Sequence, residues 1–169
     1  MELFTFGVIL VAFFVSSRNE LEVFHASRLQ LNPTWGLVNT VFLLTSGYCM
    51  ALSVRRFQRG EAGPARRLLE SALVGGLLFV VLKGIEYASK LDQGLVLGHN
   101  TFFTYYWLST CFHLMHVVVG LIILFNLRAH LVPSRVSTLK DEDYEAGAAF
   151  WHMCDLIWLI LFPALYLVV

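Results

Sequence analysis

Two histidines, His113 and His116, stand three residues apart inside YYWLSTCFHLMH, a stretch without any Asp, Glu, Lys or Arg. His152 and Asp155 repeat this spacing in a later apolar stretch. Three imidazoles and a carboxylate are a suitable ligand set for zinc, iron or copper, and i,i+3 pairs on facing helices could supply them. Haem ligation by two histidines is a second option. No HExxH, ExxH or cysteine ligand motif accompanies the histidines, so the pattern does not favour a metal.

Hydrogen bonding between helices is the interpretation that we favour for these four side chains. A neutral imidazole has one donor and one acceptor, and burying either without a partner is costly. At a rise of about 1.5 Å per residue, His113 should lie at the depth of Asp155, and His116 at the depth of His152. We therefore expect His152 and Asp155 to hold both histidines in a structural role. A proton-conducting or lipid head-group role stays open.

A third polar pair with i,i+3 spacing is formed by Lys83 and Glu86. Ionisable groups at membrane depth are costly and usually face the interior of a helix bundle. The same should hold for a stripe of residues that recur every three or four positions, and this stripe should face protein rather than lipid: Tyr105, Ser109, His113, His116 and Gly120.

The composition around these residues is that of an integral membrane protein. Of the 169 residues, 57% are hydrophobic and 14% are charged, whereas a soluble domain carries about 25% charged residues. The formal net charge is zero, so charge gives no reason to expect a nucleic acid as partner.

Four segments are long and apolar enough to span a membrane as helices, at about residues 33–54, 68–88, 102–127 and 146–169. A fifth, at about 2–17, has a short apolar core and lacks the basic start and the cleavage site of a signal peptide. We take it as a first helix, and we expect that Met1 is internal to a longer chain or that this helix is shortened. The sequence predicts one all-α bundle of five transmembrane helices over residues 1–169.

Basic residues in the connections predict how the bundle is oriented. The second connection carries Arg55, Arg56, Arg59, Arg66 and Arg67, the fourth carries Arg128, Arg135 and Lys140, and the first and third together carry only Arg18, Arg28 and Lys90. Cytoplasmic connections are richer in lysine and arginine. The second and fourth connections should therefore be cytoplasmic, with the N-terminus inside and the C-terminus outside.

Four motifs in a fixed order resemble cytochrome c oxidase subunit III. The asparagine-threonine of that family falls at Asn39 in LNPTWGLVNTVFLLTSG, and its glutamate-tyrosine falls at Glu86 in KGIEY. Its Gly-Phe-His and Leu-His-Val stretch is similar to CFHLMHVVVG, which contains His113 and His116. Its Trp-His-x-x-Asp-x-x-Trp stretch is similar to WHMCDLIW. Together the motifs extend over nearly the whole chain.

The chain also departs from that family. A full-length member has seven helices, and this chain resembles the last five. The family's glutamine before Glu-Tyr is Lys83 here, and its Gly-Phe-His begins with Cys111. Five-helix chains of this kind are similar to the accessory protein encoded with bacterial nitric oxide reductase. The resemblance places an intramembrane acid at Glu2, near mid-depth.

The resemblance implies a non-catalytic subunit whose partners hold the haem and the other redox metals. We expect a multi-pass protein of the bacterial inner membrane that supports a terminal oxidase or a nitric oxide reductase and binds phospholipid but no redox cofactor. Its intramembrane polar residues would then be structural: Glu2, Asn39, Lys83, Glu86, His113, His116, His152 and Asp155. Two other classes stay open, a small proton or ion transporter and a membrane metalloprotein.

Overall fold

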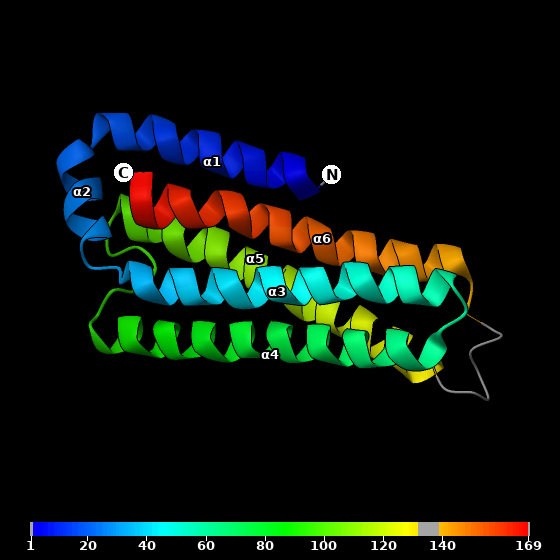
Figure 1. Ribbon diagram of the computed structural model, residues 1–169. Helices are drawn as coiled ribbons and strands as arrows, with labels where there is room; N and C mark the ends of the chain where they lie inside the picture. Colours follow the sequence, from blue (N-terminus) through cyan, green and yellow to red (C-terminus); the bar gives the residue numbers. More distant parts are fainter. Residues whose placement is uncertain (1, 132–138, 169) are drawn as a thin grey trace.

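The computed structural model describes residues 2–131 and 139–168, and every regular element in these residues is a helix. The long helices are α1 (Glu2–Asn19), α3 (Pro33–Gln58), α4 (Ala62–Asp92), α5 (Thr101–His130) and α6 (Asp141–Pro163) (Figure 1). A short helix, α2 (Leu21–Arg28), lies at one end, and α6 continues as a π-helical turn, η2 (Ala164–Val168). Within the described residues, five helices are long and apolar enough to cross a membrane. The predicted all-α class with five spans is therefore confirmed.

The long helices extend beyond the predicted spans. For example, α3 continues to Gln58, and α4 begins at Ala62 instead of residue 68. Hydropathy marks only the apolar part of a helix, whereas the backbone hydrogen bonds continue into its polar ends. The sequence did not predict α2, although its Phe24 is fully buried. Arg135, one of the basic residues from which the orientation is predicted, lies outside the described residues.

The turn signals in the sequence account for the connections on either side of α3. The side chain of Asn32 caps the helix by accepting from the Thr34 N–H at 2.9 Å, and Pro33 occupies the first helical position, where its missing N–H is not needed. Gly60 follows α3 with a φ of 75°, which favours glycine. Pro64 lies in the first turn of α4, where a proline is tolerated.

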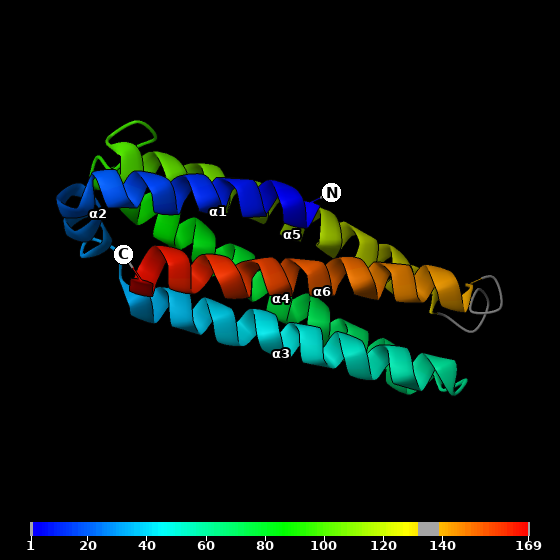
Figure 2. The same cartoon turned by 90° about the horizontal axis from the view of Figure 1, so that it is seen from above.

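The five long helices pack unequally. α3 packs most extensively against α4, while α6 packs against both α3 and α5, and α4 also contacts α5. α1 lies at the edge, mainly against α5 and α6, and it begins partway along the bundle (Figures 1 and 2). The core that positions the polar residues is therefore the four-helix group of α3, α4, α5 and α6.

A tryptophan of α6 fixes the distances within this four-helix group. Trp151 is fully buried, and a Cβ atom on Gly76 of α4 or Gly120 of α5 would lie 2.6 Å or 2.7 Å from its ring. Its Nε1 donates to Ser46 Oγ of α3 at 3.1 Å, and that hydroxyl donates to the Ala72 carbonyl of α4 at 2.6 Å. Small residues that admit close contact and interhelical hydrogen bonds are what hold membrane helices together.

We predict that Gly76→Ala destabilises the protein by roughly 1–3 kcal/mol, because the added methyl group overpacks the core against Trp151. Gly84→Ala is a matched control on the same helix, since a Cβ atom there meets nothing within 4 Å. It should be neutral or slightly stabilising, because alanine favours a helix. Thermal unfolding in detergent, followed by far-ultraviolet circular dichroism, measures both. Equal melting temperatures of the two variants would contradict the tight contact between Gly76 and Trp151.

Candidate functional site

A buried ion pair joins Lys83 and Glu86 on α4. The Lys83 Nζ donates to Glu86 Oε2 at 3.0 Å, and the two residues are 1% and 5% exposed. Lys83 also donates to the hydroxyl oxygens of Tyr166 at 2.8 Å and Tyr106 at 3.3 Å. Both hydroxyl groups in turn donate to Glu86 Oε1. The result is a closed network that links α4 to α5 and η2.

Aromatic rings complete the surroundings of the Lys83 ammonium group. Its Nζ lies 5.0–5.4 Å from the ring centroids of Tyr87, Tyr106, Trp158 and Tyr166. At such distances the ring faces attract a cation. The i,i+3 pair was visible in the sequence, but Tyr166 was not, because it comes 83 residues after Lys83 in the chain.

His116 pairs with the first helix and not, as expected, with His152 or Asp155. Its Nδ1 donates to the Phe112 carbonyl at 2.8 Å, and its Nε2 lies 2.9 Å from Glu2 Oε2. Nδ1 must carry a proton, because it donates to a carbonyl. The hydrogen bond between Nε2 and Glu2 needs a second proton, which is on Nε2 or on the carboxyl group. The expectation that α6 holds His116 is wrong. Glu2 lies opposite the middle of α5.

His113 is fully buried among aromatic rings. It stacks on Trp158 with centroids 5.3 Å apart and meets Phe79 and Phe6 edge to face. Neither ring nitrogen has a hydrogen-bond partner among the described residues, so the expected bond to Asp155 is wrong. His113 faces Trp158, about one helical turn beyond Asp155. The depth estimate failed because it relied on hydropathy ends that are shorter than the helices.

Asp155 pairs with His152 on its own helix. The His152 Nδ1 lies 3.3 Å from Asp155 Oδ2, so this pair does not link α6 to α5. The Asp155 carboxylate is buried directly against Gly47 of α3, where a Cβ atom would collide with it. Asn39 is also fully buried, and its amide has no hydrogen-bond partner among the described residues.

The predicted stripe along α5 faces the protein. Ser109, His113, His116 and Gly120 are buried, and the half-buried Tyr105 shares a hydrogen bond of 3.1 Å with Ser16 of α1. Within residues 2–131 and 139–168, no three His, Cys, Asp or Glu side chains come together in a group that could hold a metal ion. The polar pairs lie at separate places, and the contacts described above are with neighbouring helices or within one helix.

We predict that Glu86→Leu strongly destabilises the protein, by roughly 3–5 kcal/mol, because it leaves the buried ammonium group of Lys83 without its carboxylate. Replacing both partners, as Lys83→Met with Glu86→Leu, should restore much of the loss, since no buried charge remains. Lys83→Gln should be milder than Glu86→Leu, because an amide still donates to Glu86. Melting temperatures in detergent test this order. If Glu86→Leu and the double variant melt alike, the ion pair is not the cause.

Comparisons with known proteins agree in pointing to one family. The model of the family "Cytochrome c oxidase subunit III" matches residues 1–168. The chain is 27% identical over 139 residues to the probable cytochrome c oxidase subunit 3 of Mycobacterium leprae, covering 82% of this chain and 69% of that protein. It is 31% identical over 134 residues to cytochrome c oxidase subunit 3 of Pylaiella littoralis, covering 78% and 48%.

A third relative is cytochrome c oxidase subunit 3 of Corynebacterium diphtheriae, which is 24% identical over 138 residues, covering 82% of this chain and 67% of the relative. The alignments thus span about half the length of some relatives and about two thirds of others. Because the family model matches from the first residue to Val168, the chain belongs to the cytochrome c oxidase subunit III family.

Proposed function

We propose that this protein is a non-catalytic accessory subunit of a haem-copper complex and that it supports the assembly and stability of the membrane-embedded catalytic subunit. The match to the subunit III family over residues 1–168 carries this proposal. The structure supports it through the internal use of ionisable groups: Glu86 pairs with Lys83, Glu2 with His116, and Asp155 with His152. Such pairs fit a rigid supporting bundle.

The same pairs argue against the two competing classes. A transporter that used Glu2, Glu86 and Asp155 would need these carboxylates along one path, but each contacts a different basic partner in a separate part of the bundle. A metalloprotein would need convergent histidines. The described residues bring no three His, Cys, Asp or Glu side chains together, and His116 uses both ring nitrogens for bonds to protein groups.

Phospholipid is the ligand that we propose for this subunit. An apolar groove of about 760 Å³ runs along α1 and is lined by Leu3, Val8, Val11 and Val15, with Tyr105 of α5 at its side. Acyl chains fit such a surface because it offers almost no polar groups. The protein would lie in the inner membrane of a bacterium as a multi-pass subunit.

The partner complex is either a terminal oxidase or a nitric oxide reductase. The five long apolar helices agree with the resemblance to the accessory protein encoded with nitric oxide reductase, which would place the protein in denitrification. The names of the relatives, all cytochrome c oxidase subunit 3, favour the oxidase. We retain both partners, because their haem spectra distinguish them in one measurement.

We predict that a haem-containing catalytic subunit co-purifies with the tagged protein from native membranes in mild detergent. The reason is that subunit III family members function within such a complex. Mass spectrometry of the co-purified chains and the reduced-minus-oxidised spectrum identify the partner. Purification of the chain without any haem-copper subunit, or with haem bound to the chain itself, would refute the proposal.

We also propose that the connection between α3 and α4 faces the cytoplasm, with the C-terminus outside, because this connection and the helix ends beside it are rich in arginine. A cysteine at Gly63, in the first turn of α4 beside this connection, where a Cβ atom meets nothing within 4 Å, should react with a membrane-impermeant maleimide only after the cells are permeabilised. His99→Cys, in the connection between α4 and α5, is the matched control and should react in intact spheroplasts. The reverse labelling pattern would invert the orientation.

A further inference from the structure

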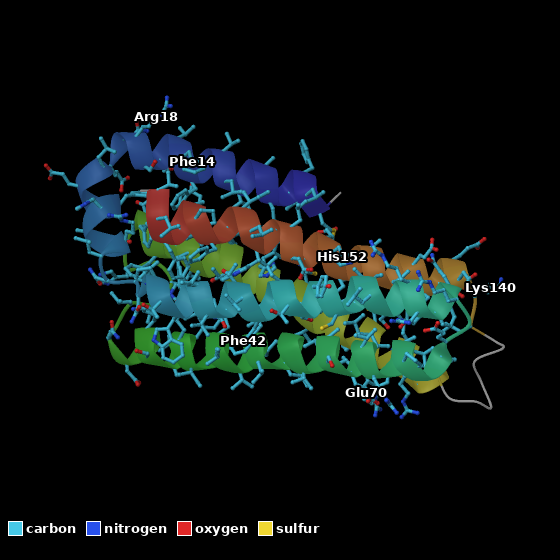
Figure 3. All side chains as sticks on the ribbon, viewed as in Figure 1. Phe14, Arg18, Phe42, Glu70, Lys140 and His152 are labelled. Carbon is cyan, nitrogen blue, oxygen red and sulfur yellow. The ribbon has the colours of Figure 1, made fainter. Side chains whose placement is uncertain are left out.

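His152 is a polar side chain at membrane depth that is not enclosed by the bundle. Its side chain is 42% exposed, and its one hydrogen bond within the described part of the chain joins Nδ1 to Asp155. It lies about 16 Å along α6 from Asp141 and about 24 Å from Val168, which puts it inside an apolar core about 30 Å thick. Figure 3 shows His152 on α6 near the level at which α1 begins.

Tyr48 of α3 has a similar position. It is 66% exposed, and its hydroxyl group makes no hydrogen bond within residues 2–131 and 139–168. It lies about 15 Å from the end of α3 at Gln58. The contact between Gly47 and Asp155 brings this level of α3 against the level of His152 on α6. Two neighbouring helices therefore present, at one depth on the outside of the bundle, two polar atoms without a hydrogen-bond partner in the described part of the chain, the Tyr48 hydroxyl oxygen and His152 Nε2.

A groove between α3 and α6 is lined in part by His152, and Tyr48 lies about one helical turn along α3 from its lining residue Ala51. It has a volume of about 420 Å³, and its lining is Ala51, Val54, Arg55, Glu145, Ala148, Ala149 and His152. The alanines leave room for a close approach by another helix. Arg55 and Glu145 lie near the end of the groove where Gln58 Nε2 donates to Glu145 Oε1 at 2.6 Å. The α3–α6 surface, which we define as this groove with Tyr48, thus combines small residues with polar groups.

We propose that the α3–α6 surface binds a transmembrane helix of the catalytic subunit and that this helix donates a hydrogen bond to His152. This inference rests on the proposed function and adds the face and the chemistry of the contact. In the tautomer whose Nδ1–H donates to the Asp155 carboxylate, Nε2 is left as the acceptor. A hydroxyl, amide or indole group of a partner helix can satisfy it.

Hydrocarbon chains cannot replace such a partner at this depth. Lipid tails have no donor, and an unsatisfied polar group in hydrocarbon is unfavourable. Tyr48 strengthens the argument, because its hydroxyl group faces the same problem on the adjacent helix. A protein helix with polar side chains at this depth can form hydrogen bonds with both His152 and Tyr48. The alanines of the groove permit the close approach that such bonds require.

Photo-crosslinking in the native complex tests the surface. A photoreactive amino acid at Ala149 should form an adduct with the catalytic subunit, whereas one at Val74, which is 56% exposed beside α5, should form none. An adduct only at Val74 would overturn the surface and leave the proposed function standing. Adducts of Ala149 with lipid alone, or with a second copy of this chain, would also overturn it. Failure of any haem-copper subunit to co-purify would overturn both proposals.

Substitution of His152 tests the hydrogen bond. His152→Leu should weaken retention of the catalytic subunit during detergent washing about threefold, the change expected for an average hydrogen bond between membrane helices. His152→Gln, whose carbonyl oxygen can accept in place of Nε2, should retain most of the partner. His99→Leu, in a connection, is the matched control. If His152→Leu behaves like His99→Leu while both variants melt like the parent, the proposed bond does not exist.

Discussion

The fit of Trp151 between two glycines is the contact on which the arrangement of the main helices depends. Within a bilayer there is no hydrophobic force that drives one apolar helix toward another, so close packing and hydrogen bonds decide which faces meet. Trp151 provides both, because its ring touches Gly76 and Gly120 while its N–H reaches a hydroxyl group on α3. A second tryptophan, Trp158, lies seven residues further along α6 and also bonds to α3, since its Nε1 donates to Thr40 Oγ1 at 3.0 Å. Four helices are thereby positioned by side chains of α6.

Polar groups in the same core fall into two kinds. Lys83 and Glu86 form a closed set with two tyrosines, so their charges and hydroxyl groups compensate one another. His113 and Asn39 are equally buried, yet they lack protein partners among the described residues. The first kind resists rearrangement, because any shift of one helix would break several bonds at once. The second kind fixes no particular neighbour by hydrogen bonding, and His113 is positioned by its contacts with aromatic rings instead.

Much of the fold was predictable because its signals are local. Spans follow from apolar length, and the Lys83–Glu86 pair follows from i,i+3 spacing on one helix. His152 and Asp155 share this spacing, but we expected them to bond to His113 and His116 on α5. The partners across helices were not predictable, because they depend on a register that shifts by a full turn when a helix end is misjudged by three or four residues. The sequence also did not indicate that the hydroxyl groups of Ser46, Thr40 and Tyr166 bond to other helices, since such residues are common in membrane helices. Only the structure shows that α1, rather than α6, supplies the partner of His116.

The marginal position of α1 has a consequence for how the protein is made. Only 17% of its span is buried, against 50% for that of α6, and its hydrogen bond between Glu2 and His116 joins residues 114 positions apart in the chain. Neighbours in sequence such as α3 and α4 can pair as soon as both have left the ribosome, because the loop between them is short. Glu2, by contrast, cannot pair with His116 until α5 has been synthesised and inserted. At typical synthesis rates of about 5–20 residues per second, this delay lasts roughly 6–23 seconds. During that interval α1 lacks its hydrogen bonds to α5.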